Sequence, residues 1–91
     1  MPESWRGTVN SVLYKVQFEK NLGDPEVIDW LAADLIERPL AGSDAGQDIA
    51  DLTAALRSEA SLTEGGIPQP HGERAVRDFL TKVVARMNDL R

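Results

Sequence analysis

Residues 73–91, ERAVRDFLTKVVARMNDLR, carry the longest continuous apolar ridge of this chain. The ridge consists of five residues at successive spacings of four, three, four and three, namely Val76, Leu80, Val83, Met87 and Leu90. This alternation is typical of a helix packed lengthwise in a seam. Phe79 and Val84 flank the ridge on opposite sides. We therefore expect a helix from about 71–73 to the end of the chain, and we expect it to form the backbone of the core.

A second helix is predicted over residues 24–38. Asp24 suits the N-cap position, Pro25 suits the first helical position, and Pro39 cannot continue the helix beyond Arg38. The apolar residues of this segment share one broad arc of the helix, and they are Val27, Ile28, Leu31, Ala32, Leu35 and Ile36. This arc predicts the buried face.

A third helix is predicted between these two, after a loop at 41–43. It starts near Ser43 or Asp44, with Gln47 placed for a capping box, and ends near Leu62. Its apolar stripe is narrow and consists of Ala45, Ile49, Leu52, Leu56 and Ala60. Glycines and prolines in residues 63–70 predict a flexible connector to the last helix.

The segment from Val9 to Glu19 fits two interpretations. As a strand it places Val12, Tyr14, Val16 and Phe18 on one face, but no other stretch of the chain is typical of a strand that could pair with it. As a helix it forms a good apolar stripe and leaves Tyr14 and Phe18 on the opposite side. We favour the helix because an unpaired strand is the rarer structure. The overall expectation is a mainly α fold, a small bundle in one domain spanning residues 1–91.

Composition limits the class of protein. A chain of 91 residues with 42% hydrophobic and 27% charged residues is typical of a soluble globular domain with a small core. The absence of cysteine excludes disulfides, thiol catalysis and the usual cysteine-bearing zinc sites. No apolar run approaches the roughly 20 residues that a membrane span needs, and residues 1–7 lack the apolar core of a signal peptide. We expect a cytoplasmic protein without a membrane partner.

The net charge of −5 is unevenly distributed along the chain. Residues 24–64 carry ten carboxylates against Arg38 and Arg57, whereas residues 1–23 and 65–91 are slightly basic. Such a field repels nucleic acid and attracts cationic protein surfaces. The arginines of the last helix are dispersed around its polar side, so we expect them to face the acidic middle helices.

Trp30 is the most informative single residue for function. In the predicted helix it falls on the acidic side, among Glu26, Asp34 and Glu37. Either another segment of the chain covers this ring, or the ring anchors a partner, a role in which tryptophan is enriched. Carboxylates at both i−4 and i+4 would favour an arginine or lysine from that partner.

A row of three carboxylates, Asp44, Asp48 and Asp51, is predicted on one face of the third helix. A solvated face, a protein-binding stripe and a metal row all fit it, in falling order of preference. The spacing of a calcium-binding loop is absent, and the glycines form no phosphate-binding motif. His71 is the only histidine, so a histidine-based catalytic or metal site would need another chain.

We therefore expect a protein-binding module that is not an enzyme and uses no cofactor or metal. Its expected partner is a basic protein, and the most concrete form is an immunity- or antitoxin-like inhibitor. The expected binding residues are Trp30, Glu26, Asp34, Glu37, Asp44, Asp48 and Asp51. The alternative is an assembly subunit, for example a homodimer, that oligomerises through its N-terminal segment or its last helix.

Overall fold

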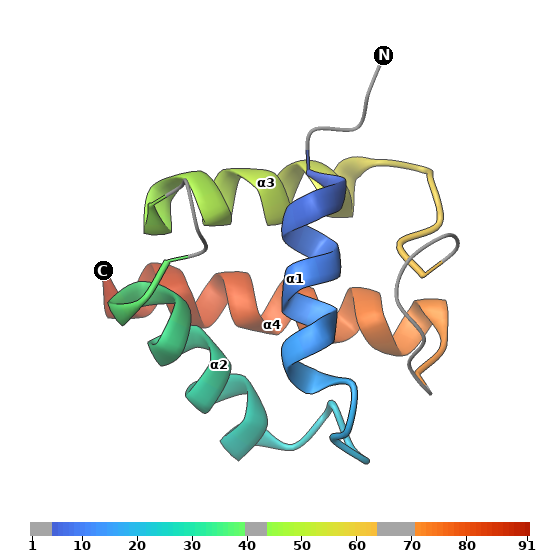
Figure 1. Cartoon of the computed structure of the whole chain (residues 1–91), viewed down its shortest axis with the longest axis horizontal. Coiled ribbons are helices and arrows are strands. Elements are labelled where there is room, and N and C mark those ends of the chain that lie inside the picture. The colour runs from blue at the N-terminus through green and yellow to red at the C-terminus, as the bar shows by residue number, and fades with distance from the viewer. Residues whose placement is uncertain (1–4, 40–43, 64–70) are drawn as a thin grey trace.

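The computed structural model describes residues 5–39, 44–63 and 71–91, and these residues form four helices and no strand. The helices are α1 (Arg6–Val16), α2 (Pro25–Glu37), α3 (Ala45–Arg57) and α4 (Glu73–Leu90). In Figure 1, α3 and α4 run in opposite directions, and α1 crosses in front of them. The predicted mainly α fold is confirmed, and the segment from Val9 is a helix rather than a strand. The loop at 41–43 and most of the predicted connector lie outside the described residues.

α4 is the helix around which the core forms. Its predicted ridge is buried from Val76 to Met87, together with Phe79, while Leu90 at the end of the helix stays partly exposed. The most extensive packing in the fold joins α4 to α2, and α4 also packs on α3. A helix in contact with two others buries a wide face, which explains why Phe79 is buried beside the ridge.

α2 begins and ends where its capping residues predict. The side chain of Asp24 accepts a hydrogen bond from the backbone N–H of Glu26 at 2.9 Å, and Pro25 occupies the first helical position. The Arg38 N–H closes the last turn on the Asp34 carbonyl at 2.7 Å, directly before Pro39. The inward face of α2 consists of four buried residues, Ile28, Leu31, Ala32 and Leu35.

α1 lies with one side on the core and the other in solvent. Its buried residues are Val9, Val12, Leu13 and Val16, and Trp5 is buried directly before the helix. The Thr8 hydroxyl donates to Asp51 of α3 at 2.8 Å, and an Arg6 guanidinium N–H donates to the Ser61 carbonyl at 2.7 Å. These bonds fix the rotation of α1, so that Tyr14 remains outside with 64% of its surface exposed. Phe18, in the turn after the helix, is 90% exposed.

α3 starts as predicted but ends earlier than predicted. Asp44 caps it by accepting from the Gln47 N–H at 2.8 Å. The side-chain amide nitrogen of Gln47 donates to Asp51 at 2.8 Å. The helix stops at Arg57, and Ser58 is already extended, so the predicted end near Leu62 is wrong by about a turn.

The segment after α3 is held by the side chain of Glu73 in the first turn of α4. Both carboxylate oxygens of Glu73 accept from the Leu62 N–H at 2.9 Å. One oxygen also accepts from the Thr63 N–H at 3.1 Å and the Ser61 hydroxyl at 2.8 Å. Burial raises the pKa of Glu73, but these hydrogen bonds and the contact with Arg77 outweigh it, and the pKa falls from 4.5 to about 2.

Arg77, one turn further along α4, holds the carbonyl groups of the same segment. Its guanidinium donates to the Ala60 carbonyl at 2.7 Å, to the Ser58 carbonyl at 3.0 Å and to the Leu56 carbonyl at 3.2 Å. Its Nε also pairs with Glu73 at 2.9 Å. We call these two residues the Glu73–Arg77 clamp. The clamp satisfies backbone groups that a longer α3 would have satisfied itself, which explains the early end of that helix.

Candidate partner-binding surface

The half-exposed ring of Trp30 lines a hollow of about 320 Å³ at the start of α2. The other lining residues are Glu19, Asp24, Glu26 and Val27. Trp30 keeps 50% of its surface exposed, so the interpretation in which another segment buries this ring is wrong. We call this feature the Trp30 hollow. It combines an aromatic wall with three carboxylates and no basic side chain.

The turn between α1 and α2 positions the acidic side of the Trp30 hollow. The side chain of Asn21 accepts from the Gly23 N–H at 2.9 Å, and the Asp24 N–H donates to the Asn21 carbonyl at 3.2 Å. A Cβ on Gly23 would stand 3.2 Å from the Asn21 side-chain oxygen, so glycine suits this close approach. The turn thus holds Asp24 beside the first residues of α2.

The carboxylates of the Trp30 hollow differ from their neighbours on α2, which form ion pairs with described residues. On the same helix, Asp29 pairs with Arg86 at 3.0 Å, and Asp34 pairs with Lys15 at 2.9 Å. Among the described residues no ion pair reaches Glu19 or Glu26. Asp24 uses one oxygen for its capping bond. The negative charge of the hollow is therefore not neutralised by an ion pair from the described part of the chain.

The structure brings only part of the predicted binding set together. Trp30 and Glu26 share the hollow, and Glu37 is exposed on the same helix. Asp34 is one turn from Trp30, but Lys15 and Arg38 hold its carboxylate and leave 15% of the side chain exposed. Asp34 is thus part of the fold's own ion pairs rather than a free acidic group.

The expectation of a solvent-facing row on α3 is wrong. Asp48 is fully buried and is held by a hydrogen-bonding or electrostatic contact. Asp44 is exposed but caps the helix, and Asp51 is half-buried under bonds from Thr8 and Gln47. The sequence held a signal for this, because Asp48 stands four residues before Leu52 and seven before Ala55, on the apolar stripe itself. Within the described residues, no group of three potential ligands could hold a metal ion.

The expected pairing of α4 arginines with the acidic helices is confirmed for Arg86, which contacts Asp29 of α2. Arg77 also faces the end of α3, but it binds the backbone carbonyls of Leu56, Ser58 and Ala60 there rather than a carboxylate. No described helix is long and apolar enough to cross a membrane.

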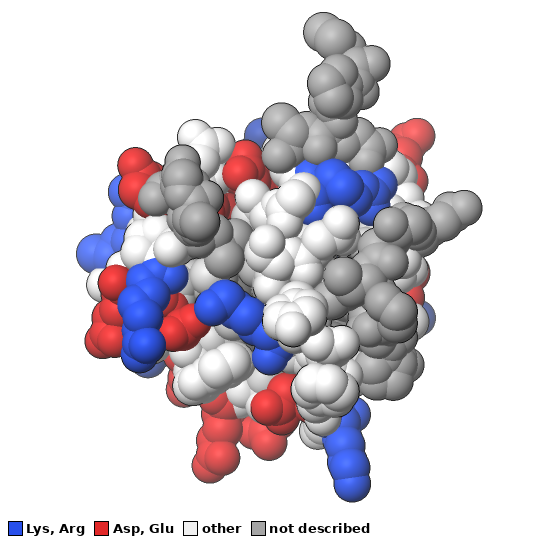
Figure 2. Space-filling model, viewed as in Figure 1, with Lys and Arg blue, Asp and Glu red and all other residues white. Residues whose placement is uncertain are grey.

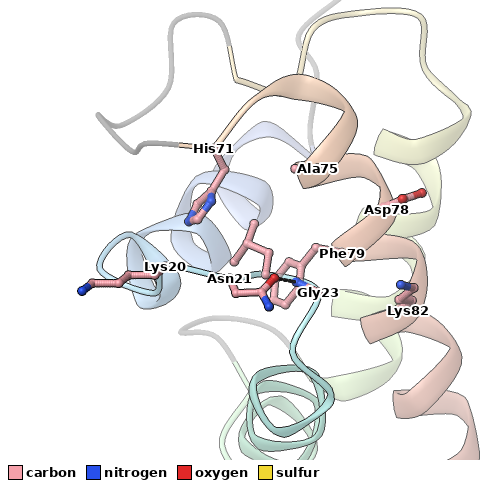
Figure 3. A pocket seen from close by; sticks show the side chains of 9 residues that line it. Lys20, Asn21, Gly23, His71, Ala75, Asp78, Phe79 and Lys82 are labelled. Carbon is pink, nitrogen blue, oxygen red and sulfur yellow. Dashed lines mark hydrogen bonds between the residues drawn. The ribbon is translucent and has the colours of Figure 1, made fainter.

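A second hollow, of about 250 Å³, lies between residues 20–23 and the first turns of α4. Its walls include Lys20, Lys82 and the only histidine, His71, above a floor of Leu22 and Phe79. Figure 3 shows that Lys20 extends away from this space and that the polar groups do not converge on one point. A catalytic site needs such convergence, so this hollow is a weaker candidate than the Trp30 hollow.

Comparison with protein-family models, curated proteins and solved structures gave no match for this chain. The geometry and charge of the surfaces described above are what indicate a function for this chain.

Proposed function

We propose that this chain is a non-catalytic protein-binding module that captures a cationic side chain of a basic protein in the Trp30 hollow. The observation that carries the proposal is a half-exposed tryptophan beside Glu19 and Glu26, two carboxylates without an ion-pair partner in the described part of the chain. An arginine or lysine placed there would lie against the ring and gain the attraction of the carboxylates. An immunity- or antitoxin-like inhibitor acting in the cytoplasm is the most concrete form of this proposal.

Charge and shape have separate roles in this mechanism. The acidic residues 24–64 attract a basic surface over a distance of about one Debye length, roughly 8–10 Å at physiological salt. The ring then supplies apolar area that is desolvated on contact, which is the usual property of an interface hot spot. An oligomer built through the last helix is less well supported, because the apolar ridge of α4 is already used inside the fold.

The direct test replaces Trp30 by alanine and compares the proteins that wild type and variant capture from the source cells. A basic protein captured by wild type should bind Trp30→Ala more weakly by at least about 2 kcal/mol. Thermal stability should change by less than about 1 kcal/mol, because half of the ring is in solvent. Leu90→Ala, another exposed apolar side chain, is the control and should bind as wild type does.

A defined probe tests the hollow itself. Hexa-arginine is titrated into a Trp5→Phe variant, so that Trp30 is the only tryptophan and its fluorescence reports the contact. Glu26→Gln in that background should weaken the effect several-fold. Glu37→Gln removes the same charge from the same helix outside the hollow and should weaken it less. Equal losses from both changes would reduce the interaction to a general attraction and would contradict the proposed site.

A further inference from the structure

The Trp30 hollow presents two features to a bound cation, an aromatic ring and carboxylates on separate elements. Glu26 lies one turn before Trp30 on α2, and side chains on a helix lean toward its N-terminus, so the ring leans toward Glu26. Glu19 lines the hollow from the turn between α1 and α2. Figure 2 shows acidic side chains at the lower edge of the molecule, where Figure 1 places the start of α2. A cation that fits this hollow therefore needs a face for the ring and several donors for the carboxylates.

The other tryptophan of the chain shows such a cation in place. The guanidinium carbon of Arg6 lies over the ring of Trp5, 4.6 Å from the ring centroid. The same guanidinium donates an N–H to the Ser61 carbonyl at 2.7 Å. One arginine thus lies against an indole and still donates to an oxygen acceptor. Among the described residues no cation lies over the ring of Trp30.

We propose, resting on the function proposed above, that the cationic side chain taken by the Trp30 hollow is an arginine of the partner and not a lysine. A guanidinium is planar and carries five N–H donors in a fork. One of its faces can therefore lie on the indole while its edges donate to Glu19 and Glu26. An ammonium is a compact point charge with three donors on one nitrogen, so it cannot spread its contacts over the ring and both carboxylates in the same way.

Hydration strengthens this preference because the hollow is open to solvent. Trp30 keeps half of its surface exposed, so the carboxylates beside it are reached by water. An ion pair in such a place contributes little by itself. A guanidinium is more weakly hydrated than an ammonium and therefore loses less when it lies against a ring. The contact with the ring thus distinguishes the two cations more than their equal charge does.

The cations inside the fold divide in the same way. Arg77 donates to three backbone carbonyls and to the carboxylate of Glu73. Lys15 donates to a single oxygen of Asp34 at 2.9 Å. A guanidinium is thus found where several acceptors surround one position, and an ammonium where one acceptor is enough. The Trp30 hollow, with three carboxylates around one ring, is of the first kind.

Two peptides of equal length and charge test the proposal. Hexa-arginine and hexa-lysine, each with the same neutral fluorophore, are titrated with the whole chain at one salt concentration, and fluorescence anisotropy gives both dissociation constants. Hexa-arginine should bind wild type at least about ten-fold more tightly. Trp30→Leu keeps an apolar side chain but removes the aromatic face, so it should reduce the ratio to about three-fold or less. Glu37→Gln, on the same helix outside the hollow, should keep the wild-type ratio.

The outcomes separate this assignment from the proposed function. If both peptides bind equally well and Trp30→Leu weakens both, a cation occupies the hollow but the choice of arginine is wrong. A preference for arginine that persists in Trp30→Leu overturns the assignment too, because the preference then arises elsewhere on the surface. If Trp30→Leu has no effect, and Glu26→Gln and Glu37→Gln weaken both peptides equally, the proposed function fails and the arginine assignment fails with it.

Methylated arginine tests the hydrogen bonds separately from the charge. Asymmetric dimethylation keeps the positive charge but blocks N–H donors on one edge of the guanidinium. A hexapeptide of dimethylarginine should therefore bind wild type several-fold more weakly than hexa-arginine. The difference should narrow in Glu26→Gln, which has lost one of the charged acceptors. A dimethylated peptide that binds wild type as tightly as hexa-arginine would overturn the contact between the guanidinium N–H groups and the carboxylates.

Discussion

Asp48 belongs to a row of carboxylates that the sequence pattern assigns to a helix surface, but the fold buries it. It is a fully buried carboxylate on α3, the helix that also carries the core residues Ile49 and Leu52. A buried carboxylate needs hydrogen bonds or a paired charge, and Asp48 makes at least one hydrogen-bonding or electrostatic contact. It therefore belongs to the internal architecture of α3 and not to the acidic surface.

Replacing a carboxylate by lysine should affect stability differently at a buried position and at an exposed one. Asp48→Lys should destabilise the fold by about 3 kcal/mol or more, because it places a cation where an anion is compensated. Glu37→Lys makes the same reversal at an exposed position of α2 and should change stability by less than about 0.5 kcal/mol. Urea denaturation followed by circular dichroism measures both. Similar stabilities for the two variants would show that Asp48 is not compensated as described.

Glu73 predicts a dependence of stability on pH. Its pKa is lowered to about 2 in the folded chain, so the carboxylate contributes stability above its ordinary pKa of 4.5. That contribution is lost as the pH falls toward 2. Glu73→Gln should cost about 2 kcal/mol at neutral pH, the usual value for hydrogen bonds to a charged group. The difference in unfolding free energy between Glu73→Gln and wild type should shrink between pH 4.5 and pH 2.

Denaturation curves at pH 7, 4.5, 3 and 2 follow this difference. Glu19→Gln removes a carboxylate on the surface and serves as the control, with less than about 0.5 kcal/mol of change at neutral pH. If the difference in unfolding free energy between wild type and Glu73→Gln is as large at pH 2 as at pH 7, the carboxylate of Glu73 does not stabilise the fold through its hydrogen bonds.

At the scale of single elements, the ends of helices were predicted correctly where they depend only on residues nearby in the sequence. The start of α2 followed from Asp24 and Pro25 and its end from Pro39, and the start of α3 followed from Asp44. These signals need only neighbours in sequence. The end of α3 could not be predicted in this way, because it depends on side chains of α4 that are distant in sequence and adjacent only in the folded chain.

The candidate site was predictable to a similar degree. Helical geometry alone placed Trp30 outside the buried face of α2 and beside Glu26. It could not show that Lys15 neutralises Asp34, or that Glu19 joins the hollow from the turn after α1, since both depend on how α1 and α2 are placed relative to each other. Tyr14 was correctly expected on the back of a helical α1, whereas Phe18 lies two residues beyond the end of that helix.

The helical state of α1 has its own test. Val16 is the last residue of this helix and is fully buried. Proline at this position removes an N–H and clashes with the preceding turn, at a cost of about 3 kcal/mol or more. Val16→Ala loses side-chain packing but keeps the backbone, so it should destabilise less and keep more helix by circular dichroism. If both variants retain the full helical signal and the same stability, α1 is not the helix described.

At the scale of the whole molecule, the uneven charge should govern the speed of association. The association rate with a basic partner should fall steeply as salt rises from about 10 mM to 150 mM, because the Debye length shrinks from roughly 30 Å to 8 Å. The dissociation rate should change less, since it depends on the contact at Trp30. Stopped-flow mixing measures both rates. An association rate that is flat over this range would remove electrostatic steering from the mechanism.

The Glu73–Arg77 clamp also has a consequence for protein engineering. Glu73 binds Thr63 directly, so the two ends of the stretch between them are already held together by the folded part of the chain. When the ends of a connection are fixed, doubling its length adds only about 0.6 kcal/mol of closure entropy. An epitope or a small reporter domain inserted between Thr63 and His71 should therefore leave the four helices in place. This junction is where we would graft a label.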